Sequence, residues 1–339
     1  MLLLACACTG GKYETFSGYA QGGTYRVKVN MQGVRVSPET VAAAIDSLLE
    51  AIDFSISGYN RNSLLSKRNA GEEIVPDRYF SELLELSEKY KELSGGAFDV
   101  YSGPLFDLWG FGFTKDTMPS ADRINAVLAS CGMGRMKADI LTAAQDGTIS
   151  SADLLKKPSA ELPRLNFNAI AQGYSCDVVA AYLYGLGVKD MLVDIGEIFC
   201  DGVNPGGKPW RVGVDRPFDG NNDPGTDLDG IWESQNAPCG IVTSGNYRKF
   251  YVHDGKKYAH TIDPRTGYPV QHNLLSATIV AKDATDADAY ATYCMVIGLD
   301  KAKEFIERSP DDLAGYLIYA DENGEMHEWA SANFNLSKR

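Results

Sequence analysis

Residues 164–196 read RLNFNAIAQGYSCDVVAAYLYGLGVKDMLVDIG, and this stretch decides the class of fold. Its apolar pattern predicts a strand over 164–167, a glycine-containing turn over 168–173, a helix over 175–187 and a strand over 190–196. A doubly wound parallel sheet would need strand and helix to keep alternating along the whole chain, and they do not. We therefore predict an α+β fold with largely antiparallel sheets and packed helices.

Sequence on both sides of this stretch favours hairpins and amphipathic helices. Residues 14–30 alternate as two strands, and the turn pairs Asp254-Gly255 and Asn323-Gly324 predict two further hairpins. Ser37 and Pro38 suit the N-cap and the first turn of a helix. Further helices are expected over 77–93, 120–132, 284–298 and 300–308.

One polar stretch has a composition that could indicate a metal-binding loop. Residues 218–230, FDGNNDPGTDLDG, resemble a calcium-binding loop in composition. They lack the Glu that an EF-hand carries at its twelfth position. We therefore predict a solvated surface loop.

Length and charge limit the classes of partner. The chain has 339 residues, which corresponds to one large domain or two ordinary ones at ~100–200 residues per domain. Its 32 Lys and Arg against 45 Asp and Glu give a formal net charge of −13. Neutralising nucleic-acid phosphates needs basic patches, so we expect no nucleic-acid partner. An anionic ligand is instead expected to be held by local donors or by a bound cation.

The N-terminus, MLLLACACTGG, contains Leu3-Leu4-Ala5-Cys6, which has the form of a lipobox. The cysteine of a lipobox receives a diacylglyceryl thioether. We expect residues 1–12 to be a lipoprotein signal, anchor and tether lipidated at Cys6, because the apolar run is too short to span a bilayer. That anchor would hold the chain at a membrane of the bacterial cell envelope, on the periplasmic side. The alternative is a frayed apolar end.

Glycines, aromatics and two acids are concentrated in GGAFDVYSGPLFDLWGFG, residues 95–112. A loop of this composition can lay its backbone against a planar ligand, with Phe98 or Trp109 as a stacking surface. The alternative is a turn whose aromatic side chains fill the core.

Two further stretches carry residues suited to chemistry. HTIDPRTGYP, residues 260–269, places His260 in a Pro/Gly turn with an acid and an arginine, although a lone histidine near a strand end is more often structural. Asp288 and Thr292 are four residues apart, so on a helix both project from one face, ~5–6 Å apart at Cβ. A carboxylate and a hydroxyl at that spacing suit Mg²⁺. The alternative is an acid near the helix N-terminus with a core-facing threonine.

In this order, nine short motifs make the chain resemble the ApbE family of FAD:protein FMN transferases over about residues 18–320. They are QGGTY (21–25), SGYNRNSLLSKRN (57–69), GGAFDVYSGPLFDLWGFG, NFNAIAQGYSCD (166–177), VDIG (193–196), WRVGV (210–214), TSGNYRKFY (243–251), HTIDPRTGYP and ADAYAT (287–292).

The resemblance implies an activity and an architecture. The family cleaves FAD at its pyrophosphate, transfers FMN to a threonine hydroxyl of an acceptor flavoprotein subunit and releases AMP, with Mg²⁺ neutralising the phosphates. The implied architecture is of the ApbE, T-fold-like type. Since the implied ligands come from both halves of the chain, we expect residues 13–339 to form one domain of two interlocked subdomains, with the active site between them.

The resemblance also assigns roles to individual positions. Asp288 and Thr292 match metal ligands, the carbonyl of Ala169 matches a third, and His260 matches the histidine near the acceptor hydroxyl and the flavin. The positions that match FAD-holding residues are Tyr59, Ala97, Phe98 and Asp99.

The chain departs from the family pattern at three flavin-binding positions. Gln21 opens QGGTY where many members have Met-Gly-Thr-Thr-Tyr. Asn166 and Gln172 stand where many have an Asp and a Lys. The joint loss of an acid and a base keeps the local charge unchanged, which favours a neutral pair typical of a subfamily.

Two alternative functions stay open from the sequence. With water as the acceptor, the same site would be an FAD pyrophosphatase that gives FMN and AMP. A flavin-binding lipoprotein without chemistry is the other alternative, but such a protein would not obviously need Asp288 and Thr292.

Overall fold

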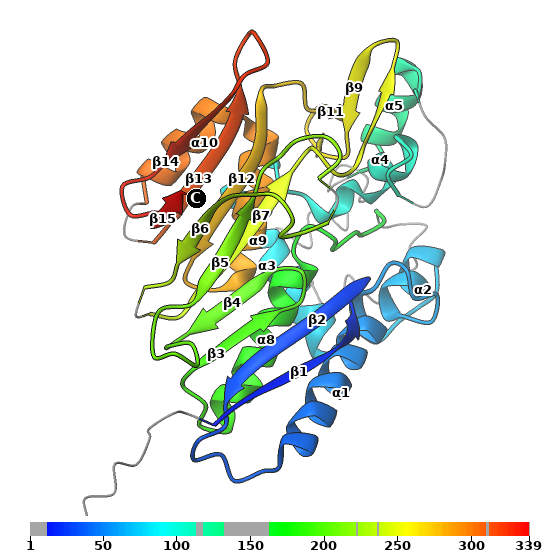
Figure 1. The fold of residues 1–339 in the computed structure, drawn as a ribbon. Coiled ribbons are helices and arrows are strands. Elements are labelled where there is room, and N and C mark those ends of the chain that lie inside the picture. Colours follow the sequence, from blue (N-terminus) through cyan, green and yellow to red (C-terminus); the bar gives the residue numbers. More distant parts are fainter. Residues whose placement is uncertain are drawn as a thin grey trace, which may run out of the picture.

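An eight-stranded sheet forms the centre of the computed structural model, which describes residues 12–112, 118–131, 163–221, 223–235, 237–309 and 312–338 (Figure 1). Every neighbouring pair of its strands is antiparallel. The α+β prediction with antiparallel sheets is thereby confirmed. In sheet order the strands are β1 (Tyr13–Ala20), β2 (Gly23–Asn30), β3 (Met191–Asp194), β4 (Ile198–Asp201), β7 (Cys239–Gly245), β12 (Leu274–Ala281), β13 (Ala314–Ala320) and β14 (Met326–Ala330).

Three long helices cover one face of this sheet: α1 (Pro38–Ile56), α8 (Ala171–Gly185) and α9 (Ala284–Ile297) (Figure 1). The α1 helix begins as predicted, because the Ser37 hydroxyl accepts the Thr40 amide at 3.3 Å. Val41 and Ile45 of α1 pack on the sheet. Burying such a side chain contributes about 1.5–3 kcal/mol, so this layer supplies much of the stability.

The remaining described helices surround these layers. They are α2 (Leu64–Ala70), α3 (Arg78–Leu93), the 3-10 helix η1 (Val100–Ser102), α4 (Gly103–Leu108), α5 (Ala121–Leu128) and α10 (Leu299–Glu307). The helices expected over 77–93, 284–298 and 300–308 therefore form within one or two residues of their predicted bounds. Among the described residues, no helix combines the length and apolarity needed to cross a membrane.

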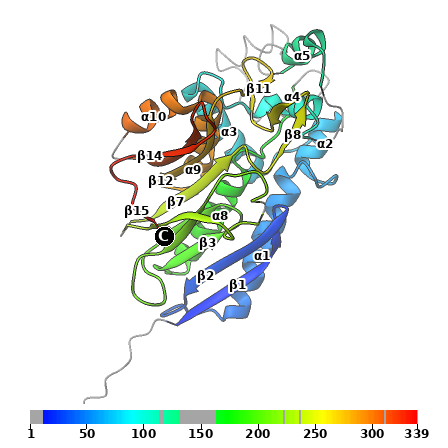
Figure 2. The same ribbon diagram turned by 45° about the horizontal axis from the view of Figure 1, so that its top comes forward.

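Small sheets complete the fold. A three-stranded sheet of β5 (Arg211–Asp215), β6 (Leu228–Glu233) and β15 (Leu336–Lys338) packs on the other face of the main sheet through Trp210 and Trp232. The hairpins predicted at Asp254-Gly255 and Asn323-Gly324 form as β8–β9 (Phe250–His253, Lys256–Ala259) and β13–β14. A last pair is β10 (Ile262–Asp263) with β11 (Tyr268–Pro269). Figure 2 shows α4, α5 and β8 together at one end of the molecule.

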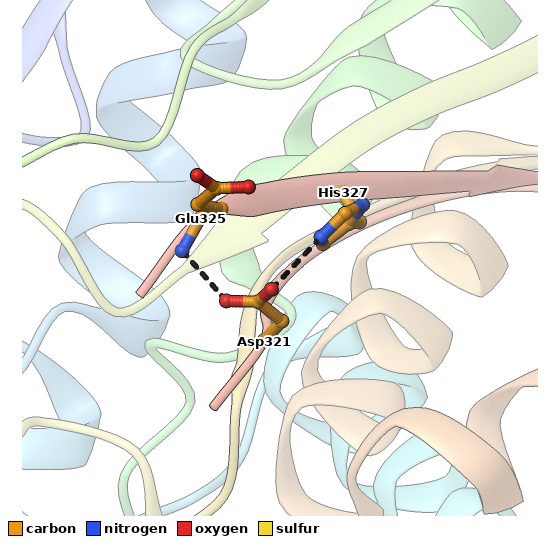
Figure 3. Close-up of side chains that lie close together, drawn as sticks. All are labelled: Asp321, Glu325 and His327. Carbon is orange, nitrogen blue, oxygen red and sulfur yellow. Dashed lines mark hydrogen bonds and ion pairs between the residues drawn. The ribbon is translucent and has the colours of Figure 1, made fainter. Parts of the chain in front are cut away.

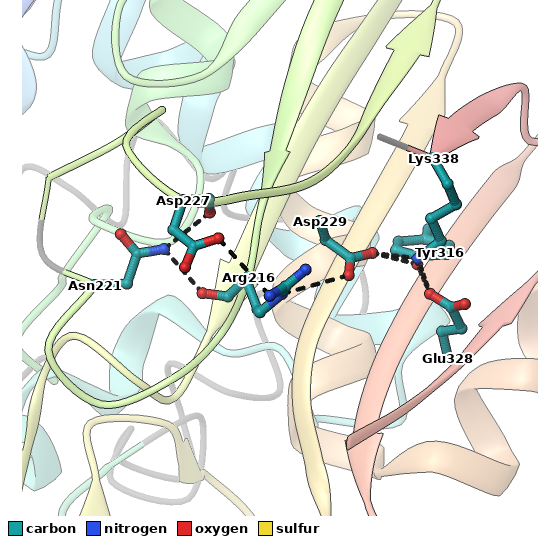
Figure 4. Close-up of polar contacts among 7 residues, drawn as sticks. All are labelled: Arg216, Asn221, Asp227, Asp229, Tyr316, Glu328 and Lys338. Carbon is teal, nitrogen blue, oxygen red and sulfur yellow. Dashed lines mark hydrogen bonds and ion pairs between the residues drawn. The ribbon is translucent and has the colours of Figure 1, made fainter. Parts of the chain in front are cut away.

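The C-terminal strand is fixed by a charged network (Figure 4). Lys338 donates to Asp229 and to the Tyr316 hydroxyl, each at 2.6 Å, and to Glu328. Arg216 lies 3.8 Å from the far side of Asp229. Strands β6, β13, β14 and β15 are thereby joined around one cluster.

The stretch 218–230 is largely the solvated loop that its composition predicts, since residues 218–220 and 223–226 are exposed. Its last three residues belong to β6, and Asn221 is only 3% exposed. The Asn221 amide donates to the carbonyls of Arg216 at 2.9 Å and Asp227 at 3.2 Å, which folds the loop on itself (Figure 4). These internal hydrogen bonds, which composition does not reveal, explain why Asn221 is buried within an otherwise exposed loop.

One predicted strand and the bounds of two predicted helices are wrong. Residues 164–167 belong to none of the sheets. The Asn69 side chain forms hydrogen bonds with both the N–H and the C=O of Leu165, so these groups are not available to a neighbouring strand. The helix expected over 175–187 starts four residues earlier, at Ala171. The helix expected over 120–132 ends at Leu128, where the Ser130 hydroxyl binds the Val127 carbonyl at 2.7 Å. The predicted lipobox with Cys6 lies outside the described residues.

Candidate functional site

A cavity of about 330 Å³ lies where the loops before α4 and α8 meet β7 and α9. It is large enough to admit part of a nucleotide-sized ligand, and stretches far apart in the sequence line it. Ten of the eleven predicted ligand-contacting positions line it: Tyr59, Ala97, Phe98, Asp99, Asn166, Ala169, Gln172, His260, Asp288 and Thr292. The fold therefore gathers in one cavity positions that the sequence spreads over 234 residues (59–292).

The predicted cation ligands lie on one helix and in one turn. Asp288 and Thr292 occupy α9, and Ala169 belongs to the turn that leads into α8. The amide of Gly173, in the first turn of α8, donates to Oδ2 of Asp288 at 3.1 Å. One carboxylate oxygen is thereby held by the backbone, and a carboxylate has further lone pairs for another partner.

The electrostatics of Asp288 fit a bound cation. The residue is 5% exposed, and burial, together with the negative charge of Asp177, raises the pKa of its carboxyl to about 7. A buried carboxylate is costly unless a positive charge faces it. Carboxylate, hydroxyl and carbonyl oxygens form the donor set preferred by a hard divalent cation. Asp288, Thr292 and the Ala169 carbonyl are the residues that could hold one.

His260 lines the cavity in a defined tautomer. Its Nδ1 lies 3.1 Å from the carbonyl oxygen of Lys249. A carbonyl oxygen only accepts, so the proton is on Nδ1, and Nε2 carries the lone pair. Burial, and then the charge of Lys249, lowers the pKa of His260 to about 4. The imidazole is therefore neutral at pH 7 and able to accept a proton at Nε2.

The predicted flavin-binding positions Tyr59, Ala97, Phe98 and Asp99 line the same cavity. Phe98 is 2% exposed and packs edge-on against Tyr90, with ring centroids 5.8 Å apart. Tyr59 is 67% exposed at the rim, where its hydroxyl accepts from the Asn168 amide at 3.3 Å. Asp99 accepts the Tyr101 amide at 2.9 Å and pairs with Lys91 at 3.0 Å. An exposed ring beside fixed polar groups suits a planar ligand.

Asn166 and Gln172 both line the cavity, but they use different contacts. The Asn166 side chain accepts the Asn168 amide at 2.9 Å. Gln172 lies against Gly196, whose φ is +92° and whose missing Cβ would lie 2.5 Å from Nε2. In the described parts of the chain, no hydrogen bond joins Asn166 to Gln172.

Two aromatic or polar candidates lie elsewhere. Gln21 is not among the residues that line the cavity; with Gly22 it forms the two-residue turn between β1 and β2, at φ 52° and 81°. Its flavin-binding role stays a prediction. Trp109 is 2% exposed, stacks on Tyr258 and donates to the Gly267 carbonyl at 2.8 Å. For Trp109 the alternative of a core-filling aromatic is thus correct.

The cavity also contains charged residues that sequence reasoning missed. Glu197 follows the VDIG motif directly, and burial, with the charge of Asp288, raises its pKa. Arg248 and Lys249 enter from TSGNYRKFY. The guanidinium of Arg248 donates to Asp215 at 2.5 Å and to the Asn221 carbonyl at 3.3 Å. The available signal was position within a motif for Arg248 and Lys249, and position directly after one for Glu197.

A second group of ligand-type side chains lies at the turn between β13 and β14 (Figure 3). Oδ1 of Asp321 accepts the amides of Asn323 and Glu325, both at 2.8 Å, and Oδ2 lies 3.3 Å from Nε2 of His327. The Glu325 amide is the main reason that the pKa of Asp321 is lowered. These contacts close the hairpin turn and account for the cluster without an ion.

The fold and this cavity define a flavin transferase, as comparison with known proteins shows. The model of the ApbE family matches residues 22–317, and the chain belongs to that family. FAD:protein FMN transferase from Haemophilus influenzae is 32% identical over 99% of this chain and 95% of its own length. The Escherichia coli K12 protein of the same name is 32% identical over 86% of this chain and 79% of its own.

Solved structures agree with this assignment. Flavin transferase ApbE from Vibrio cholerae matches with a TM-score of 0.76 at 30% identity, over 95% of this chain and 98% of that one. The apo form of Pseudomonas stutzeri flavinyl transferase ApbE matches with a TM-score of 0.79 at 30% identity, over 96% of both chains. The family expected from the sequence motifs is thereby confirmed.

Proposed function

We propose that the chain is an Mg²⁺-dependent FAD:protein FMN transferase that acts on a threonine of an acceptor protein. The observation that carries this proposal is the single cavity in which His260 lies with Asp288 and Thr292. One group accepts a proton, and the others are oxygen donors for a cation. Transfer of a phosphoryl-type group needs both functions side by side.

The reaction assigns a step to each part of the cavity. The acceptor hydroxyl gives its proton to Nε2 of His260 as its oxygen forms a bond to the FMN phosphorus. The bond between that phosphorus and the AMP oxygen breaks, and AMP leaves with the bonding electrons. Bound Mg²⁺ would neutralise the pyrophosphate charge, held by Asp288, Thr292 and the Ala169 carbonyl. Arg248, in the bend between β7 and β8, would orient the same phosphates.

The test is a transfer assay with the chain that lacks the N-terminal tether. It is incubated with FAD, Mg²⁺ and an acceptor domain that contains a threonine flavinylation sequence, and the acceptor is weighed by mass spectrometry. A gain of one FMN moiety with release of AMP is expected. FMN and AMP without an adduct would indicate the pyrophosphatase, and intact FAD would indicate a binding protein without chemistry.

A matched pair of variants tests the cation ligand. Asp288→Ala is expected to abolish transfer and Mg²⁺ binding while the fold is kept, because the carboxylate supplies the only charge among the three proposed ligands. Asp300→Ala, in the first turn of α10, is the control that removes a helix carboxylate away from the cavity. Full transfer by Asp288→Ala at chelator-buffered low Mg²⁺ would contradict the assignment.

We also propose that Cys6 is lipidated and that residues 1–12 tether one domain to the envelope membrane on its periplasmic side. The lipobox is the support for this proposal. Labelled palmitate fed to a bacterial host should enter the wild-type chain and not the Cys6→Ala variant. Label in both, or in neither, would contradict lipidation at Cys6.

A further inference from the structure

The helices α8 and α9 are joined by a carboxylate that the proposed reaction does not use. Asp177, in the middle of α8, accepts the backbone amides of Ala284 at 2.9 Å and Thr285 at 2.8 Å. It also accepts the Thr285 hydroxyl. The first residues of α9 have amides without partners inside their own helix. Asp177 therefore caps α9 from a neighbouring helix.

A second contact lies one turn earlier on the same face of α8. Gly173 is four residues before Asp177, and its amide binds Asp288. A Cβ at Gly173 would lie 2.3 Å from the Ala284 carbonyl oxygen and 2.8 Å from Cβ of Asp288. The backbone of α8 at Gly173 therefore lies directly against the backbone of α9 at Ala284.

These two contacts fix the register of α9. Ala284, Asp288 and Thr292 follow one another at four-residue spacing, so they share one face of the helix. Asp177 accepts the amide of Ala284 at the beginning of that face, and the Gly173 amide donates to Asp288 one turn further along. A slip or rotation of α9 would break the Asp177 contacts and would move the two oxygen donors in the cavity.

We propose that Asp177 is a positioning residue that places Asp288 and Thr292 for the divalent cation by fixing the start of α9 on α8. This inference rests on the proposed function, since the cation belongs to it. Asp177 acts through the helix and need not touch the cation. Loss of an outer partner of a metal ligand typically costs roughly 10–100-fold in metal affinity.

Asp283 provides a matched control on the same helix. It is the N-cap of α9, and its Oδ1 accepts the Asp286 amide at 2.7 Å. That contact lies within α9 and does not link it to α8. Removing the Asp283 carboxylate therefore weakens the beginning of α9, but it leaves the contacts that hold α9 in place on α8.

The experiment compares wild type, Asp177→Asn, Thr285→Val and Asp283→Ala in the full chain. Mg²⁺ affinity is measured by calorimetry, FAD affinity without Mg²⁺ by flavin fluorescence, and stability by thermal unfolding. The side-chain amide in Asp177→Asn has one oxygen to accept hydrogen bonds, and its NH₂ group would face a backbone N–H of α9 that needs an acceptor. We therefore expect Asp177→Asn to bind Mg²⁺ roughly 10–100-fold more weakly, with FAD affinity within about twofold of wild type. Thr285→Val should show a smaller loss of the same kind.

Asp283→Ala should lower the melting temperature by a few degrees and leave Mg²⁺ affinity unchanged. Equal loss of Mg²⁺ affinity in Asp283→Ala and Asp177→Asn would overturn the inference, because helix stability alone would then explain it. If Asp177→Asn does not fold, Thr285→Val with wild-type Mg²⁺ affinity overturns it. Wild-type transfer with unchanged Mg²⁺ affinity in Asp177→Asn rejects this inference alone, whereas a wild-type chain that binds no Mg²⁺ rejects the proposed function as well.

Discussion

The amide of Gly173 and the carboxylate of Asp288 meet across the contact between α8 and α9, at 3.1 Å. The same contact leaves no room for a side chain at position 173. A glycine in the first turn of a helix is therefore required by the close approach of a second helix, and one hydrogen bond ties that approach to a proposed cation ligand.

Gly173→Ala should impair both stability and Mg²⁺ binding. The new methyl group would lie against backbone atoms of Ala284, which have no rotamer to escape into, so the helices must separate. Overpacking of this kind typically costs about 1–3 kcal/mol in the free energy of unfolding. Urea denaturation and calorimetric Mg²⁺ titration measure the two effects.

Gly185→Ala is the control for that prediction. Gly185 ends the same helix, and a Cβ there meets nothing within 4 Å. Alanine is favoured over glycine in a helix by up to about 1 kcal/mol, so this variant should be unchanged or slightly more stable. A Gly173→Ala variant that behaves like Gly185→Ala would show that the helices do not approach so closely.

His260→Asn should remove transfer while FAD and Mg²⁺ still bind. An amide cannot take the acceptor proton, and general base catalysis is worth about 10²–10⁴ in rate. Single-turnover transfer with saturating acceptor measures this step, and flavin fluorescence measures binding. His253→Asn, on the exposed β8 strand, should transfer at the wild-type rate. If FAD affinity in His260→Asn fell by the same factor as the rate, this would contradict the role of His260 as the general base.

The rate of transfer should not fall near pH 6.5, where an ordinary histidine becomes protonated. The pKa of His260 is lowered to about 4, so the ring stays neutral as the pH falls through 6 and 5 and takes its proton only below that. At saturating Mg²⁺ and FAD, the single-turnover rate should therefore change little on this account between pH 8 and pH 5. A fall centred at pH 6.5 that disappears in His260→Asn would show that the ring is more exposed to water than the structure indicates.

Arg248→Gln should weaken FAD binding more than it slows transfer. The guanidinium is held toward the cavity by Asp215 and the Asn221 carbonyl, and a charged hydrogen bond is worth about 1.5–3 kcal/mol. We expect KM for FAD to rise roughly 10–100-fold. Asp215→Asn should give a smaller rise, since it only loosens Arg248.

Arg308→Gln is the charge-matched control for Arg248→Gln. Arg308 pairs with Glu304 along α10 and does not line the cavity. An equal rise of KM in this control would mean that net charge, and not the position of Arg248, governs the binding of the anionic substrate.

Local sequence determined the elements and the order of the motifs. Ser37-Pro38 starts α1, and the turns Asp254-Gly255 and Asn323-Gly324 close two hairpins. The four-residue spacing places Asp288 and Thr292 on one helix face. Such features depend only on neighbours along the chain. The motif order also identified the family. Even the fold class followed from the failure of strand and helix to alternate.

Only the tertiary structure decided which of these residues meet. Leu165 lies outside the sheets because the side chain of Asn69, 96 residues earlier, forms hydrogen bonds with its backbone N–H and C=O. Glu197 enters the cavity because it directly precedes β4, which pairs with β7. Trp109 is in the core and Gln21 in a turn, away from the cavity that their motifs suggested. Hydrogen bonds and close contacts between distant segments depend on packing, which no local pattern encodes.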